Sequence, residues 1–297
     1  MVSGLPGIFF DIIGPVLVLV AVGFGVGRWL GLSPEPFAKL AFWAFGPAFM
    51  FDALANAGLP SNVLIEVAGA SLIALAGAGL FALAGSARLS KDRRAAILTT
   101  SVYGNTGNFG LAMIIFTFGN DAIPFAAVCL VVVNTVGLIV GIASTQSGWA
   151  GLATAFTRPM TLIIVPALFV NGFGWTLPPI ADRPIGLMAQ ALVPMMLVTL
   201  GIQLEQMQRP TIGLDVALSL VAKLLVQPLV AVAAVTVIGL TDLAAGAVIL
   251  QAAMPAAVFA TVLAIEQKTR PEETATIVMA GTLASILTLP WFILYVT

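Results

Sequence analysis

This 297-residue sequence contains no histidine, a single cysteine and only 8% charged residues. Because histidine is absent, acid–base catalysis by imidazole and most zinc or haem sites are excluded. Because Cys129 is alone, the chain has neither an internal disulfide nor a Cys-x-x-Cys motif. The formal net charge of −1 provides no basic surface for nucleic acid. We therefore predict a protein that is not an enzyme and that has no cofactor, metal or nucleic-acid partner.

Hydrophobic residues, in contrast, make up 60% of the chain, and the mean hydropathy is +1.10. A membrane-spanning helix needs about 20 predominantly apolar residues. Ten segments meet this requirement, at residues 8–30, 36–58, 62–86, 94–119, 122–145, 158–174, 182–204, 211–239, 243–266 and 272–296. Short connections join them. The sequence thus predicts an all-α polytopic membrane protein embedded in a lipid bilayer.

The lysine and arginine residues predict an orientation, since cytoplasmic connections are rich in them. Most of the 12 basic residues lie at odd-numbered connections, namely Arg28, Lys39, Arg88, Lys91, Arg93, Arg94, Arg158, Arg209, Lys268 and Arg270. Arg183 lies at an even-numbered connection, and Lys223 lies inside the eighth segment. We therefore expect the odd-numbered connections to be cytoplasmic, both termini to be external, and the protein to reside in the inner (plasma) membrane of the cell.

Weak internal echoes relate the two halves of the chain. The Gly-Phe-Gly sequence at 23–25 recurs at 172–174, and the Pro-Ala-Phe-Met sequence at 47–50 is echoed by Pro-Met-Met-Leu at 194–197. Five helices cross the membrane an odd number of times, so a second set of five helices begins on the opposite face of the membrane. This is the inverted-repeat plan of many transporters. We predict a first repeat at 1–145, a short cytoplasmic connection at 146–157 and a second repeat at 158–297.

The fourth segment, 94–119, is interrupted near its middle. Residues 103–108 read Tyr-Gly-Asn-Thr-Gly-Asn, a composition that weakens helical pairing and offers polar groups instead. Non-helical backbone at membrane depth is tolerated only where it lines a cavity or is buried in protein. Asn105 and Asn108 supply amide donors and acceptors, while Gly104 and Gly107 allow close backbone approach. We interpret this segment as a discontinuous helix whose break forms part of a binding site.

A partner for this break is predicted about 150 residues later, in the ninth segment. Adding that offset to Asn105 leads to Pro255, within the sequence Ala-Ala-Met-Pro-Ala-Ala at 252–257. Proline inside a helix removes a backbone hydrogen bond and clashes with the preceding turn. Paired interrupted helices bring two helix N-termini and two helix C-termini to the membrane centre. This geometry suits an anion, a cation, or both together.

A few other polar residues lie at membrane depth. Gln251 precedes Pro255 by one turn, and Asn134 lies in the middle of the fifth segment. Both are candidates for substrate binding, although interhelical hydrogen bonding is the alternative. Lys223, a charged residue inside a helix, is a candidate for gating or for an ion pair, with snorkelling to the membrane surface as the alternative. Asp52 is the best candidate for a carboxylate that carries a proton.

Several short motifs together resemble the auxin efflux carrier family of transporters, in its bacterial permease form. They are Asn105-Thr106, Gly110-Leu111 and Phe118-Gly119 in the fourth segment, the Ala-Ala-Met-Pro-Ala-Ala sequence at 252–257, and the tail at 283–294. The family usually has proline after the Gly-Leu pair, whereas this chain has Ala112. The outer half of the fourth helix is therefore expected to bend differently.

The resemblance implies a fold like that of the sodium/bile acid symporters. Helices 1, 2, 6 and 7 would form a scaffold, and helices 3–5 and 8–10 would form a mobile core that slides past it in an elevator-type mechanism. It also implies small organic anions as substrates and a homodimer formed through the scaffold.

Two classes of function follow from the sequence and the resemblance. The leading one is a secondary active or facilitative transporter of organic anions (carboxylates) with the site at the crossing of helices 4 and 9, and a Na⁺-coupled symporter of the bile-acid type is its alternative. Coupling to Na⁺ or H⁺ stays open, and no GxxxxGK[ST] motif for ATP is present. The other class comprises a non-transporting receptor, a channel, or an intramembrane enzyme that would need Asp11 and Asp52 as a pair.

Overall fold

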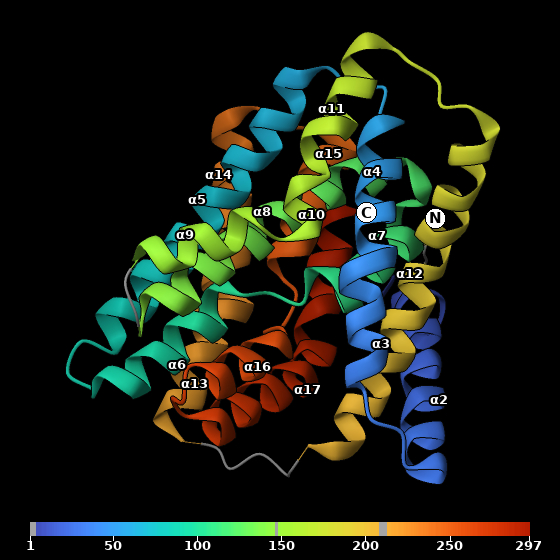
Figure 1. Ribbon diagram of the computed structural model, residues 1–297. Helices are drawn as coiled ribbons and strands as arrows, with labels where there is room; N and C mark the ends of the chain where they lie inside the picture. The colour runs from blue at the N-terminus through green and yellow to red at the C-terminus, as the bar shows by residue number, and fades with distance from the viewer. Residues whose placement is uncertain (1–3, 146–147, 208–212) are drawn as a thin grey trace.

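The computed structural model describes residues 4–145, 148–207 and 213–297, and within them the regular secondary structure is helical apart from one isolated β-bridge (Figure 1). Seven helices among these residues are long and apolar enough to cross a membrane, and shorter apolar helices cover Thr106–Phe118, Pro159–Phe173 and Asp242–Ala252. The prediction of an all-α polytopic membrane protein is confirmed, whereas the ten-span inverted repeat stays a prediction. Arg209, one of the basic residues counted above, lies outside the described residues.

The first half of the chain contains the elements that lead to the first break. In chain order they are α1 (Gly4–Gly7), η1 (Ile8–Ile13), α2 (Gly14–Leu30), α3 (Glu35–Leu40), η2 (Ala41–Phe45), α4 (Gly46–Ala55), α5 (Ser61–Gly85), α6 (Lys91–Val102), η3 (Thr106–Gly110), α7 (Leu111–Phe118), η4 (Asn120–Ala122) and α8 (Ile123–Ala143). η4 is a 3₁₀ turn, and the other η elements are π-helical.

The second half repeats this pattern of long and interrupted helices. Its elements are α9 (Gly148–Phe156), α10 (Pro159–Leu162), α11 (Ile164–Phe173), α12 (Pro179–Gln206), α13 (Leu214–Val221), the π-helical η5 (Ala222–Val226), α14 (Gln227–Ile238), α15 (Asp242–Ala252), α16 (Phe259–Glu266) and α17 (Pro271–Val296). The connection predicted at 146–157 therefore contains a helix, α9, which packs against α8.

Prolines explain most of the π-helical stretches. η1, η2 and η5 each end just before a helix that has proline in its first turn, at Pro15, Pro47 and Pro228. Proline has no N–H to donate, and its ring pushes against the turn that precedes it. The preceding turn therefore widens into a π-helical turn, and the long helix continues with a local distortion instead of ending.

The long helices form two bundles. In the first bundle α2 packs along α12, and α4 packs against both α11 and α12; Figure 1 shows α2, α4 and α12 together on the right. In the second bundle α5 packs against α14 and α8, while α15, α16 and α17 pack around the interrupted segments. The connection α2–α3 lies at the bottom of Figure 1, and α4–α5 and α11–α12 lie at the top. The bottom end therefore carries the first of the connections predicted to be cytoplasmic.

Two glycines allow α2 and α12 to touch through their backbones. A Cβ added to Gly201 would lie 2.0 Å from the Val20 carbonyl oxygen, and one added to Gly23 would lie 2.0 Å from the Val198 carbonyl oxygen. Small residues at such contacts permit the close packing that associates helices in a membrane.

We expect Gly201→Ala to destabilise the first bundle. Its methyl group has no space against the α2 backbone, so the helices must separate, at a cost of about 1–3 kcal/mol that is typical of overpacking. The melting temperature of the purified protein in detergent should fall by several degrees. Gly25→Ala is the matched control, since nothing lies within 4 Å of a Cβ at that position. Equal melting temperatures for the two variants would show that the close contact does not exist.

Candidate functional site

The two interrupted helices meet in the interior, and their non-helical segments pair. Gly104 and Ala256 form the antiparallel β-bridge. The backbone N–H of Asn105 donates to the Pro255 carbonyl at 2.7 Å, and the N–H of Ala257 donates to the Tyr103 carbonyl at 2.8 Å. Each break thus supplies hydrogen-bond partners to the other, which removes the several kcal/mol that unpaired backbone groups cost at membrane depth.

The local sequence explains why each helix stops there. α6 ends at Val102, and Tyr103 adopts an extended conformation before Gly104. α15 ends at Ala252, and Pro255, which has no N–H, prevents the helix from continuing. Beyond the first break, the Asn105 carbonyl accepts hydrogen bonds from the N–H groups of Phe109 and Gly110 and opens the π-helical η3. The residues that break the helices are therefore also the residues that pair.

The crossing collects helix ends of both polarities. α6 and α15 end there, while η3–α7 and α16 begin there. A helix N-terminus carries about +0.5 charge with free N–H groups, and a C-terminus carries about −0.5 with free carbonyls. The crossing therefore offers donors for an anion and acceptors for a cation within one small region.

A lysine from another helix lies beside the crossing. The side chain of Lys223, in η5, is only 2% exposed. Its ammonium donates to the Gln227 side-chain oxygen and, at 3.1 Å, to the Ala252 carbonyl at the end of α15. It also approaches Gly104, since a Cβ at Gly104 would lie 2.9 Å from Nζ. None of the ion pairs among the described residues includes Lys223. Its positive charge is thus held by neutral partners directly behind the bridge.

A large cavity of about 1240 Å³ extends from the crossing to the end of the protein drawn at the bottom of Figure 1. It runs between the two bundles. Residues of the first bundle and of the elements that lead into it form one wall, including Phe42, Arg158, Met160, Met196, Thr199 and Gln203. Residues of the second bundle form the other wall, including Tyr103, Asn105, Asn108, Asn134, Phe259 and Thr261.

Four of the predicted substrate-binding residues line this cavity: Asn105, Gly107, Asn108 and Asn134. Asn105 is 3% exposed, and its Nδ2 has no hydrogen-bond partner among the described residues. The Asn134 Nδ2 makes only a weak contact, 3.9 Å from the Met160 sulfur. Because a buried amide without a partner costs about 1–3 kcal/mol, these side chains favour a site that a polar ligand completes.

The other predicted residues do not line the cavity. Pro255 lies behind the bridge, and its role is the backbone hydrogen bond from Asn105. Gln251 is 1% exposed and points at Gly110, where a Cβ would lie 2.1 Å from its Oε1; neither of its amide atoms has a hydrogen-bond partner among the described residues. Asp52 accepts a hydrogen bond from the Asn56 amide at 3.0 Å. Lys223 lies behind Gly104, as described above.

Sequence reasoning missed the first-bundle wall of the cavity. The sequence identified Arg158 only as a charge at a connection and did not single out Phe42 or Met196; on the second-bundle wall, it did not single out Phe259 either. These side chains line the same cavity as the crossing, and Phe42 of η2 stacks on Phe259 of α16 across it. One local signal existed: Arg158 precedes Pro159, and a residue before proline is held in an extended conformation.

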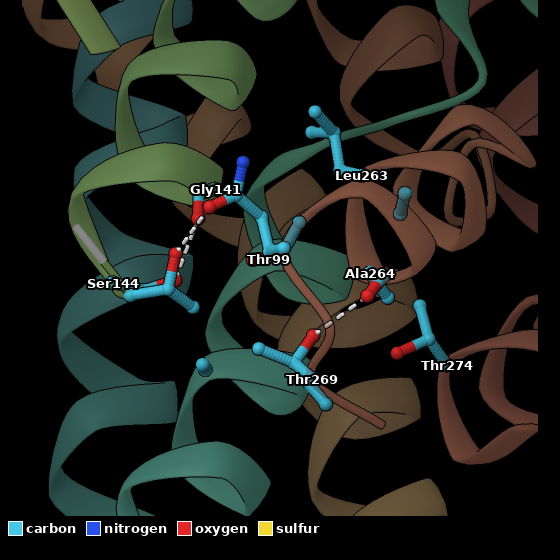
Figure 2. A pocket seen from close by; sticks show the side chains of 12 residues that line it. Thr99, Gly141, Ser144, Leu263, Ala264, Thr269 and Thr274 are labelled. Carbon is cyan, nitrogen blue, oxygen red and sulfur yellow. Dashed lines mark hydrogen bonds between the residues drawn. The ribbon is translucent and has the colours of Figure 1, made fainter. Parts of the chain in front are cut away.

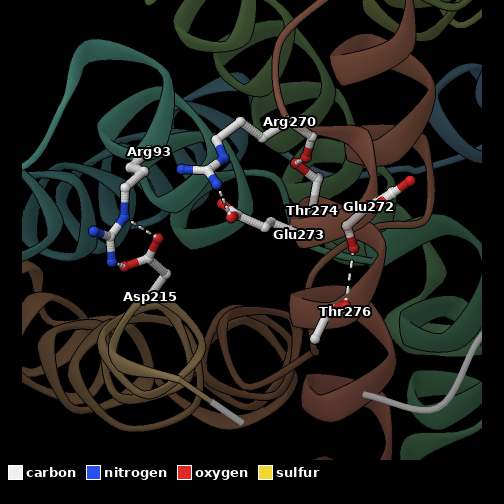
Figure 3. Close-up of polar contacts among 7 residues, drawn as sticks. All are labelled: Arg93, Asp215, Arg270, Glu272, Glu273, Thr274 and Thr276. Carbon is white, nitrogen blue, oxygen red and sulfur yellow. Dashed lines mark hydrogen bonds and ion pairs between the residues drawn. The ribbon is translucent and has the colours of Figure 1, made fainter. Parts of the chain in front are cut away.

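Ion pairs surround the mouth of the cavity (Figure 3). Arg93 of α6 makes two hydrogen bonds to the Asp215 carboxylate of α13, at 2.7 and 2.6 Å, and Arg270 pairs with Glu273. The hydrogen bonds to Asp215 raise the pKa of the Arg93 guanidinium further above its already high value. The Arg93 guanidinium therefore stays charged at physiological pH, and its hydrogen bonds tie α6 to α13, two elements of the second bundle.

A second, much smaller cavity lies between α6, α8 and α16 (Figure 2). Serine and threonine residues contribute hydroxyl groups to its lining. Two of these hydroxyls donate to nearby carbonyls, Ser144 to Gly141 at 2.7 Å and Thr269 to Ala264 at 3.2 Å. With a volume of about 10 Å³, it has room for a single water molecule at most. It does not compete with the large cavity as a substrate site.

Comparison of the sequence with known proteins relates this chain to transporters. Residues 146–293 match a family model described as membrane transport protein. A protein of Methanothermobacter thermautotrophicus, named an uncharacterized transporter, is 26% identical over 289 residues, which cover 93% of this chain and 94% of that protein. The second similarity extends across both interrupted helices.

Proposed function

This chain belongs to the membrane transport protein family, and from that premise we propose that it carries small organic anions, specifically carboxylates, across the inner membrane. The site would lie where the two interrupted helices cross. The observation that carries the proposal is Asn105, which lines the large cavity and whose buried side-chain Nδ2 has no hydrogen-bond partner among the described residues. A carboxylate oxygen is an acceptor of the kind that this donor requires.

The charge around the crossing supports an anion over a neutral solute. η3–α7 and α16 begin at the crossing, so their N–H groups and positive dipole ends favour negative charge. The amino group of Lys223 lies behind Gly104 and adds to this positive end when it is protonated. The C-terminal carbonyl of α15 is already occupied by that ammonium. Of the two signs that crossed helices permit, the residues here favour the anion.

The division into two bundles supports an alternating-access mechanism of the elevator type. Helices α2, α4, α11 and α12 would form the scaffold, and the second bundle, with the crossing at its centre, would be the mobile core. The cavity runs along the boundary between them, which is where a sliding core needs a solvent-filled path. With the odd-numbered connections assigned to the cytoplasm, this conformation is open to the inside. The homodimer through the scaffold and the coupling to Na⁺ or H⁺ remain proposals that follow from the resemblance.

Uptake by proteoliposomes tests this proposal. The panel comprises labelled acetate, lactate, malonate, succinate, malate, citrate and benzoate, each measured with and without a Na⁺ gradient and with and without a pH gradient. We expect saturable movement of at least one carboxylate. A thermal-shift screen of the same acids gives an independent readout, since a ligand stabilises the folded protein by RT ln(1 + [L]/Kd).

The panel also separates the alternatives. Flux that does not change with the Na⁺ gradient would argue against a Na⁺-coupled symporter. Single-channel conductance would identify a channel, since a carrier moves its substrate too slowly to produce one. If no acid in the panel is transported or bound, the carboxylate proposal fails.

A further inference from the structure

Arg158 is the strongest feature of the cavity that the proposed function does not yet use. It lies at the start of α10, on the first-bundle wall, and it lines the large cavity. Its guanidinium carbon lies 5.5 Å from the centroid of the Phe42 ring, the geometry of a cation–π contact. Its Nε is buried and has no hydrogen-bond partner among the described residues. The guanidinium thus packs on an aromatic face, and none of the ion pairs in the part of the chain that the structure describes includes it.

Every other positively charged side chain that lines the cavity is already paired. Lys39 pairs with Glu35 at 2.6 Å, and Arg93 pairs with Asp215. The mouth also carries Glu266 and Glu272, which belong to none of the ion pairs among the described residues. The outer part of the cavity is therefore not selective for anions by its charge. Selection for negative charge must depend on groups deeper inside.

A row of side chains links Arg158 to the crossing. Phe42 stacks on Phe259 with ring centroids 6.0 Å apart and an interplanar angle of 5°, and Phe259 contacts Tyr103 edge to face at 5.7 Å. Phe259 is the first residue of α16, and Tyr103 precedes the bridge. Arg158 and Phe42 approach from the first bundle, whereas Phe259 and Tyr103 belong to the second. This row positions the guanidinium on the opposite wall from the Asn105 and Asn108 amides.

We infer that Arg158 binds the charged group of the substrate and makes the cavity selective for anions. The inference rests on the proposed function, and it assigns to the first bundle a contact that nothing else in the cavity provides. An arginine fork donates two parallel hydrogen bonds to a carboxylate, a geometry that lysine does not reproduce. The substrate would then be held between a cation on one bundle and amides on the other. Arg158 would bind the negative charge of the substrate, and the crossing would supply the remaining polar contacts.

The test compares carboxylates with their uncharged amides. For each panel acid that the wild type binds, the dissociation constants of the acid and of its carboxamide are measured on wild type, Arg158→Gln and Arg158→Lys. We expect Arg158→Gln to weaken binding of the acid by about 10- to 100-fold, the usual value of a charge-assisted hydrogen bond. Binding of the amide should change by less than about 3-fold, because a neutral amide has only one acceptor oxygen and no charge for the guanidinium to bind. Arg158→Lys should recover part of the loss.

Two controls keep structural effects apart from recognition. Arg183→Gln removes an exposed arginine that does not line the cavity, and it should bind both ligands like the wild type. Phe42→Leu removes the aromatic face but keeps the charge, and it should weaken acid binding by about 2- to 5-fold.

Equal losses of acid and amide binding in Arg158→Gln would show a structural role and overturn the inference. So would unchanged acid binding in Arg158→Gln, which would leave the proposed function intact if Asn105→Ala still lost binding. A wild type that binds no acid in the panel would overturn both proposals.

Discussion

Asn105→Ala should reduce carboxylate binding and transport by about 10- to 100-fold while the protein keeps its fold. Asn105 lines the cavity, and its buried Nδ2 has no partner among the described residues. The substitution should therefore remove the hydrogen bond proposed between this amide and a charged ligand, worth about 1.5–3 kcal/mol. The backbone hydrogen bond from Asn105 to Pro255 does not involve the side chain. The bridge between the two breaks therefore survives the substitution.

Uptake into proteoliposomes and the melting temperature in detergent together check this expectation. Asn120→Ala is the matched control, because Asn120 is an exposed amide at the start of η4 and does not line the cavity. Wild-type transport by Asn105→Ala would remove the crossing from the substrate path. A collapse of the melting temperature would instead show that the Asn105 side chain supports the fold.

Lys223→Met should weaken carboxylate binding by about 30-fold. Two opposite unit charges about 8 Å apart attract each other by about 2 kcal/mol at an effective dielectric constant near 20, which sets the scale of the expected loss. Removing the ammonium leaves the Gln227 and Ala252 oxygens without their donor, which costs about 1–3 kcal/mol each. It also removes the desolvation cost of a buried charge, which is several kcal/mol. Because these terms oppose each other, the melting temperature should change by only a few degrees.

The size of the ligand-induced thermal shift measures this effect. We expect the shift that a bound panel acid produces in the wild type to shrink or vanish in Lys223→Met. Lys91→Met removes an exposed lysine that contacts the Thr145 carbonyl and should leave the shift unchanged. If Lys223→Met bound carboxylates as tightly as the wild type, the charge behind Gly104 would have no part in anion binding.

Much of the architecture was accessible from the sequence because the signals were local. Apolar length predicted segments whose bounds differ from the observed helices by only a few residues. Glycine, asparagine and proline at 103–108 and 255 predicted the two breaks, and the 150-residue offset related Asn105 to Pro255. The structure pairs these two residues through a backbone hydrogen bond. Both breaks occur at residues whose backbone chemistry disfavours a helix, namely glycine and proline.

The cavity lining was less accessible because it depends on tertiary placement. Gln251 precedes Pro255 by one turn, yet its side chain points at Gly110, and it is not among the residues that line the cavity. Lys223 was assigned to gating or an ion pair, but its neutral partners lie on two different helices. Arg158 has the sequence context of a connection, and only the opposition of the two bundles brings it into the cavity.

The most direct test of the crossing as an anion site is protection of a cysteine placed beside it. Met196→Cys puts a thiol on α12, where the methionine side chain lies 3.9 Å from a Cβ at Gly107. The native Cys129 is buried. A bound carboxylate from the panel should slow modification by a charged methanethiosulfonate reagent about 10-fold at a concentration of ten times Kd. Modification of Thr276→Cys, at the mouth, should not slow. If carboxylates that stabilise the protein leave Met196→Cys fully reactive, the anion does not bind at the crossing.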